Sequence, residues 1–102
     1  MNTMLADARD ADVIIANPTH YSVALKWDRL PGSAPICVAK GVDHIALQIR
    51  TIASDANIPI HEDVPTARAL YASVDVGDEI PPQHYAAVAT AIRFAENARG
   101  MR

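Results

Sequence analysis

Four consecutive residues, Asn17, Pro18, Thr19 and His20, combine side chains that could together break a peptide bond. Asparagine normally degrades when the backbone nitrogen of the next residue attacks its side-chain carbonyl. Proline has no N–H, so this route is closed at Asn17. The Asn17 side-chain nitrogen can instead attack the carbonyl of its own residue, which would form a C-terminal succinimide and release Pro18 as a new N-terminus.

This reaction makes three demands on the surrounding structure. The Asn17 side chain must be held in attack geometry, a group must accept a proton from its amide nitrogen, and the leaving Pro18 nitrogen must gain one. His20 is suited to proton transfer near neutral pH, and a strained turn would distort the peptide. Asn-Pro is also common in ordinary turns, so these residues alone leave an inert turn as the alternative.

The flanking elements place this tetrapeptide between two strands. Four segments have patterns typical of short strands, namely 13–16, 21–27, 36–39 and 58–61. Apolar residues recur at helical spacing in three segments, which are 42–56, a segment that opens at Pro65 and ends by Gly77, and one that opens at Pro81. Gly41 is expected to break the third strand, and Asn57 to end the first of these helices.

The order of these elements predicts an α/β fold. A strand, a helix and a strand between Ile36 and Ile60 indicate a right-handed crossover and a parallel pair. We therefore expect a small mixed sheet of about four strands, covered by about three helices. Residues 1–11 are good helix formers without a full apolar face, which is typical of a frayed helix or a linker.

Composition excludes several classes of function. The chain has 102 residues, half of them hydrophobic, so a single packed domain is expected. The formal net charge is −3 and no run of Lys or Arg occurs, which argues against nucleic acid or an anionic membrane surface as the main partner. No apolar stretch could span a bilayer, and the N-terminus lacks a signal-peptide pattern.

The remaining polar candidates favour structural roles. His44, His61 and His84 are far apart, and none has a partner at metal-ligand spacing. Cys37 lies within an apolar strand, so we expect it to be buried and inert. No phosphate-binding loop occurs, and the sequence predicts neither a cofactor nor a metal.

Five collinear segments resemble the FlhB/YscU family of type III export-switch proteins. They are 13–25, 34–43, 58–60, 67–71 and 77–81, and together they cover nearly the whole chain in the family's order. Three stretches, 20–21, 39–44 and 76–81, are more similar to the flagellar branch of the family than to the injectisome branch.

The resemblance implies a cytoplasmic domain that cleaves itself between Asn17 and Pro18. Asn17 matches the cyclising residue, Pro18 the leaving residue, and Thr19 and His20 the supporting turn. Residues 1–11 would be the end of a linker helix that follows a transmembrane region, and 12–102 the switch domain. Family members lie at the cytoplasmic face of the bacterial inner membrane. Their cleavage changes the exported substrates from rod and hook proteins to filament proteins.

The resemblance also implies a docking patch for early export substrates. The expected partners are these substrates and other proteins of the export apparatus. The matching residues are Ala34 and Pro35 in a loop, with Ala89 and Ile92 on the last helix, although the spacing of the last two suits core packing equally well.

Two alternative functions stay open: a docking domain that does not cleave itself, and a small hydrolase that uses His20. A hydrolase would need a ligand-sized pocket at the strand ends, and the chain lacks a Gly-x-Ser-x-Gly motif.

Overall fold

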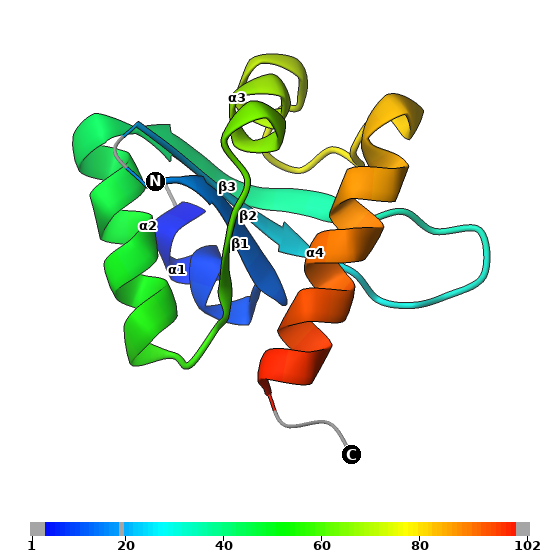
Figure 1. The fold of residues 1–102 in the computed structure, drawn as a ribbon, viewed down its shortest axis with the longest axis horizontal. Coiled ribbons are helices and arrows are strands. Elements are labelled where there is room, and N and C mark those ends of the chain that lie inside the picture. The colour runs from blue at the N-terminus through cyan, green and yellow to red at the C-terminus, as the bar shows by residue number, and fades with distance from the viewer. Residues whose placement is uncertain (1–3, 19, 100–102) are drawn as a thin grey trace.

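The structure is a computed structural model that describes residues 4–18 and 20–99. Its elements are α1 (Met4–Asp7), the 3-10 helix η1 (Ala8–Asp10), β1 (Val13–Asn17), β2 (Tyr21–Lys26), β3 (Ile36–Val42), α2 (Asp43–Asp55), β4 (Ile60–Glu62), α3 (Val64–Ser73), the 3-10 helix η2 (Pro82–His84) and α4 (Tyr85–Ala98). Figure 1 shows the strands at the centre, with helices on both sides. None of the helices in this part of the chain is long and apolar enough to cross a membrane.

The strands form one mixed sheet in the order β3-β2-β1-β4. β1 is antiparallel to β2 and parallel to β4, and β2 is antiparallel to β3. The predicted fold class is therefore confirmed. The expected partner in the parallel pair was wrong, because β4 pairs with β1 and not with β3. The reason is that α2 carries the chain from one edge of the sheet to the other, so β3 and β4 end up on opposite edges.

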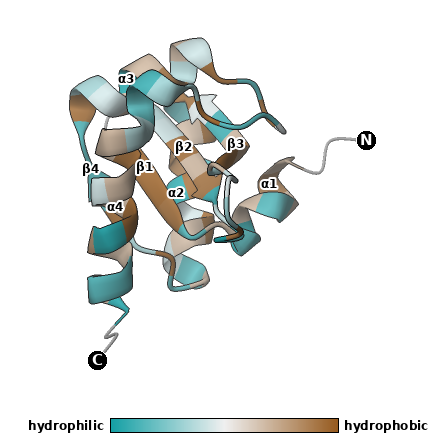
Figure 2. Ribbon diagram, turned by 90° about the vertical axis from the view of Figure 1, so that its right-hand side faces the viewer, coloured by the Kyte–Doolittle hydropathy of each residue, from teal (hydrophilic) through white to brown (hydrophobic). Residues whose placement is uncertain are grey.

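The side chains of β1 alternate between two hydrophobic cores. Val13 and Ile15 share one core with residues of α3 and α4, whereas Ile14 lies in the other core with residues of η1 and α2. All three are completely buried. Figure 2 shows the hydrophobic strands between α4 on one side and α1 on the other. β1 is thus covered on both faces and paired on both edges.

Gly41 does not break the third strand as expected. β3 runs through it to Val42, and Gly41 pairs with Ser22 of β2. Its role is steric, because a Cβ built at this position would lie only 2.7 Å from the Cβ of Ile45 in α2. The lack of a side chain lets the helix pack closely on the strand.

The helix boundaries otherwise follow the predicted signals. Asn57 adopts a left-handed conformation (φ 60°) just after α2, as its position suggested. Pro65 lies in the first turn of α3, where the Asp63 carboxylate accepts a hydrogen bond from the N–H of Thr66 at 3.2 Å. In the N-terminal segment, α1 and η1 are short, and Ala8 is completely buried against the sheet.

Candidate functional site

The connection between β1 and β2 is a tight turn that contains the Asn-Pro dipeptide. Asn17, the last residue of β1, pairs with Tyr21, the first residue of β2. The backbone N–H of His20 donates a 2.9 Å hydrogen bond to the carbonyl oxygen of Asn17 and closes the turn. Asn17 is half-buried and Pro18 is exposed, whereas the predicted site residue Thr19 lies outside the described residues. The structure thus brings Asn17, Pro18 and His20 together at one end of the sheet.

The hydrogen-bonded carbonyl of Asn17 is the group that its own side chain would attack. Such an attack turns the carbonyl oxygen into an oxyanion, and a donor that already points at this oxygen stabilises the developing charge. The following bond is an amide of Pro18, whose nitrogen carries no hydrogen. The turn therefore favours attack on the carbonyl of the Asn17–Pro18 bond over the ordinary backbone route to deamidation.

Buried contacts hold the strands on both sides of this turn. Ser22 in β2 is completely buried, and its hydroxyl donates a 3.0 Å hydrogen bond to the carbonyl of Ala46 in α2. At the end of β1, the carbonyl of Ala16 accepts a 3.0 Å hydrogen bond from the N–H of Asp63. Because reacting groups fixed in advance lose little entropy in the transition state, such a frame suits an intramolecular reaction.

The imidazole of His20 lies at the surface beside the first residue of α2. Its Nδ1 atom is 3.9 Å from Oδ1 of Asp43, and 62% of its side chain is exposed. The backbone N–H of Asp43 also donates a 2.9 Å hydrogen bond to the carbonyl of His20. Sequence reasoning missed Asp43, because its approach depends on the pairing of Val42 with Tyr21 across two distant segments.

A second candidate site lies between α4 and the loop that follows β2. The four residues predicted to bind substrates, Ala34, Pro35, Ala89 and Ile92, line a single cavity of about 510 Å³. We call this cavity the α4 groove. The described residues that line it are Trp27, Arg29, Gly32, Ser33, Ala34, Pro35, Ile80, Tyr85, Val88, Ala89, Ile92, Arg93 and Glu96. Ala89 is exposed in the groove, whereas Ile92 is only 6% exposed and also belongs to the core. The expectation of core packing is therefore confirmed for Ile92, and its role in docking stays a prediction.

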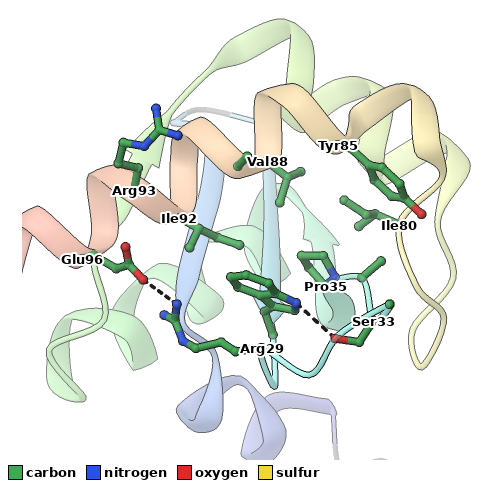
Figure 3. A pocket seen from close by; sticks show the side chains of 13 residues that line it. Arg29, Ser33, Pro35, Ile80, Tyr85, Val88, Ile92, Arg93 and Glu96 are labelled. Carbon is green, nitrogen blue, oxygen red and sulfur yellow. Dashed lines mark hydrogen bonds and ion pairs between the residues drawn. The ribbon is translucent and has the colours of Figure 1, made fainter.

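An ion pair lies at one end of the α4 groove. The guanidinium of Arg29 in the loop donates a hydrogen bond to the carboxylate of Glu96 in α4, and Figure 3 shows this contact at the opposite end of the groove from Tyr85. The Arg29 guanidinium also lies 5.1 Å from the centre of the Trp27 ring. The sequence did not point to this pair, because 67 positions separate its members.

Internal hydrogen bonds shape the loop wall of the groove. The indole N–H of Trp27 donates to the hydroxyl of Ser33 at 3.2 Å. The carboxylate of Asp28 accepts from the N–H of Leu30 and from the Ser33 hydroxyl. Both hydrogen bonds hold the pKa of Asp28 below its ordinary value, and the bond from Leu30 has the larger effect. The groove therefore has an ordered loop on one side and a helix on the other.

The two candidate sites lie at opposite ends of β2. The β1–β2 turn precedes Tyr21, and the loop of the α4 groove follows Lys26. A strand of this length spans roughly 20 Å. His20 does not line the groove, so the pocket that a hydrolase using His20 would need is not at this cavity.

The other histidines occupy separate surroundings. The ring of His61 lies 4.9 Å from the ring of Phe94, centre to centre, and Nε2 of His84 is 3.4 Å from the hydroxyl of Ser73. His44 is exposed in the first turn of α2. Within residues 4–18 and 20–99, no three His, Cys, Asp or Glu side chains are grouped as metal ligands would be.

Cys37 is completely buried in β3, as the apolar pattern predicted. Burial raises the pKa of its thiol to about 11. Because the thiolate is the reactive form of cysteine, this environment supports the prediction that Cys37 is inert.

A family model described as the FlhB HrpN YscU SpaS family matches residues 1–95. The chain belongs to this family. The flagellar biosynthetic protein FlhB of Escherichia coli K12 is 53% identical over 91 residues, which are 89% of this chain and 24% of that protein. FlhB of Bacillus subtilis is 44% identical over 94 residues, 92% of this chain and 26% of that protein. The chain thus spans about a quarter of the length of these FlhB relatives.

Solved structures of FlhB and EscU share the fold. The cytoplasmic domain of FlhB from Shewanella putrefaciens has a TM-score of 0.86 at 38% identity, covering 95% of this chain and 78% of that one. A mutated EscU C-terminal domain also has a TM-score of 0.86 at 32% identity, covering 93% and 95%.

Several solved EscU domains carry single substitutions to alanine. One replaces an asparagine, another the proline that follows it, and a third the histidine two residues after that proline. Asn17, Pro18 and His20 of this FlhB-family chain have the same spacing.

Proposed function

We propose that this chain is the cytoplasmic domain of a flagellar type III export component that cleaves itself between Asn17 and Pro18. The observation that carries the proposal is the 2.9 Å hydrogen bond from His20 N–H to the Asn17 carbonyl, which precedes a proline amide. Membership of the FlhB family supports the flagellar assignment. By the same analogy, an N-terminal region anchors the parent protein in the bacterial inner membrane, and this domain faces the cytoplasm.

The cleavage is an intramolecular transfer of the Asn17 acyl group. The side-chain Nδ2 of Asn17 forms a bond to its own carbonyl carbon, and the bond from that carbon to the Pro18 nitrogen breaks. Nδ2 loses one proton and the Pro18 nitrogen gains one, so the products are a C-terminal succinimide and a free proline amine. Each chain reacts once on itself, which makes it a single-turnover reaction.

The neighbouring residues have separate roles in this step. The N–H of His20 stabilises the oxyanion, and its imidazole accepts the proton from Nδ2 and passes it toward the leaving nitrogen. Pro18 blocks the competing attack, because it offers no backbone N–H.

Cleavage places a new amine and a new C-terminal group at the surface beside α2. This local change is the signal that switches the exported substrates from rod and hook proteins to filament proteins. The α4 groove lies at the opposite end of β2 from the turn, so the change in the turn does not alter the lining of the groove directly.

Denaturing electrophoresis and intact mass measurement of the purified protein test the cleavage directly. Two pieces, residues 1–17 and 18–102, are expected. One intact chain would contradict the proposal and favour the alternative, a substrate-docking domain of the export apparatus that does not cleave itself.

The α4 groove is the docking site for rod and hook proteins in this proposal. Its apolar floor, which includes Ala34, Pro35 and Ile92, would bury an apolar side chain of the substrate. Ala89→Asp would place a charge in the groove at an exposed helix position, so binding of a rod or hook protein should weaken while the domain stays folded. Ala86→Asp is the matched control, because Ala86 is exposed on the same helix but does not line the groove. Equal binding by the two variants would contradict docking at this site.

A further inference from the structure

We propose that Asp43 is a positioning residue for self-cleavage, an inference that rests on the function proposed above. Asp43 contacts His20 through two separate groups. Its backbone N–H donates a 2.9 Å hydrogen bond to the His20 carbonyl, and its carboxylate Oδ1 lies 3.9 Å from Nδ1 of the imidazole.

The backbone contact fixes the donor that faces the reacting carbonyl. The two sides of His20 are held at the same time, since its N–H donates to Asn17 and its carbonyl accepts from Asp43. A shift of Asp43 would therefore move the N–H that polarises the Asn17 carbonyl. Small displacements of this kind reduce the rates of intramolecular reactions strongly.

The side-chain contact directs the imidazole. At 3.9 Å the carboxylate of Asp43 is beyond hydrogen-bond length, but it attracts a proton-bearing Nδ1 toward α2. The other ring nitrogen is then free to face the turn and to carry the proton that leaves Asn17. This division of the two nitrogens is common where a histidine acts as a base.

The backbone at Asp43 has an uncommon conformation that accounts for the residue type. Its φ is 51°, at the corner where β3 turns directly into α2. Aspartate, asparagine and glycine accept this left-handed region more readily than other residues. Substitutions at Asp43 can therefore separate the effect of the conformation from that of the carboxylate.

The experiment follows cleavage of newly translated chains by electrophoresis, together with thermal unfolding of each product. Asp43→Asn keeps the left-handed conformation and an oxygen acceptor, so it should cleave within about threefold of the parent rate, whereas Asp43→Ala should be about tenfold slower or more. Asp43→Gly keeps the conformation but loses the side chain, so its cleavage rate should fall between those of the Asn and Ala variants.

The matched control is Asn57→Ala, which imposes the same left-handed strain (φ 60°) at the other end of α2, roughly 20 Å away.

Asn57→Ala should lose as much thermal stability as Asp43→Ala and still cleave at the parent rate. If both slow cleavage equally, Asp43 is only a structural residue and the inference fails. If Asp43→Ala does not fold, a Gly variant that cleaves as fast as the Asn variant overturns the inference. Parent-rate cleavage in all Asp43 variants overturns it too while leaving self-cleavage intact, whereas an intact parent chain overturns both.

Discussion

Asn17 pairs with Tyr21 as the last rung of the β1–β2 ladder, and the bond from Asn17 to Pro18 lies just beyond that rung. The carbon that is attacked therefore belongs to a residue fixed by the sheet, while the leaving nitrogen belongs to an exposed proline. The hydrogen bonds of the ladder are made by backbone groups. Substitution of the Asn17 or Pro18 side chain should therefore have little effect on the sheet.

Asn17→Ala is expected to abolish cleavage. The alanine side chain has no nucleophile that could cyclise onto the carbonyl of residue 17. Electrophoresis under denaturing conditions should show one intact chain for this variant and two pieces for Asn97→Ala, an exposed control in α4. Cleavage of Asn17→Ala at the parent rate would contradict the cyclisation mechanism.

Pro18→Ala is expected to slow cleavage or divert it to ordinary deamidation. The substitution restores a backbone N–H, which opens the attack of that nitrogen on the Asn17 side-chain carbonyl. Mass spectrometry should then find an intact chain with the mass increase of an asparagine-to-aspartate change. If the variant cleaves as fast as the parent, proline has no chemical role in the turn.

His20→Ala is expected to slow the cleavage of newly made chains, because the variant lacks the imidazole that would accept the proton from the Asn17 amide. The variant keeps the backbone N–H that donates to the Asn17 carbonyl, so cleavage should be slower but not abolished. Electrophoresis of timed samples under denaturing conditions measures the two rates. An unchanged rate in the variant would leave the geometry of the turn as the main source of acceleration.

The sequence predicted the residues of the turn but not the residue that approaches it from outside. The alternation of strand residues and the Asn-Pro signal are local, so they placed the Asn-Pro dipeptide at the connection of two strands, although β1 runs one residue further than predicted and ends at Asn17. The contact of Asp43 with His20 depends on the register between β2 and β3. A long loop joins these strands, so the sequence does not show which of their residues pair. The Arg29–Glu96 pair was missed for a similar reason, since it joins a loop to a helix much later in the chain.

Two backbone features also escaped prediction. Gly41 looked like a strand terminator, because local propensity does not show that α2 packs directly against it. The parallel partner of β4 was misassigned, because a helix of 13 residues can carry the chain across the whole sheet as readily as to a neighbouring strand. In both cases tertiary packing decided the outcome.

Gly41→Ala is expected to destabilise the domain by about 1–3 kcal/mol, because the added methyl group would overlap the Ile45 side chain and force α2 away from β3. Urea unfolding measures this loss. Adding Ile45→Gly should remove both close side-chain contacts, because it deletes the Cβ of residue 45 that would lie 2.7 Å from the added methyl group. The double variant should therefore be more stable than the sum of the single effects predicts. Simple additivity would mean that close helix packing does not explain Gly41.

The buried contacts of β1 should hold the two pieces of the cleaved chain together. The N-terminal piece contains β1, whose Val13, Ile14 and Ile15 are completely buried. Burying each of these side chains contributes roughly 1.5–3 kcal/mol. β1 is also paired on both edges, with β2 and with β4, and buried donors and acceptors left without partners would add a further cost. Cleavage of the Asn17–Pro18 bond in the turn removes none of these contacts.

We therefore expect residues 1–17 and 18–102 to remain one folded domain after cleavage. The His20 carbonyl keeps its hydrogen bond to Asp43, so the change is confined to the few residues after Asn17. Gel filtration of the cleaved protein in native buffer, with mass detection of both pieces in every fraction, tests this expectation. The same column run in denaturant serves as the control, because there the pieces should elute separately. Separation in native buffer would mean that cleavage acts by dissociation and not by a local change of surface.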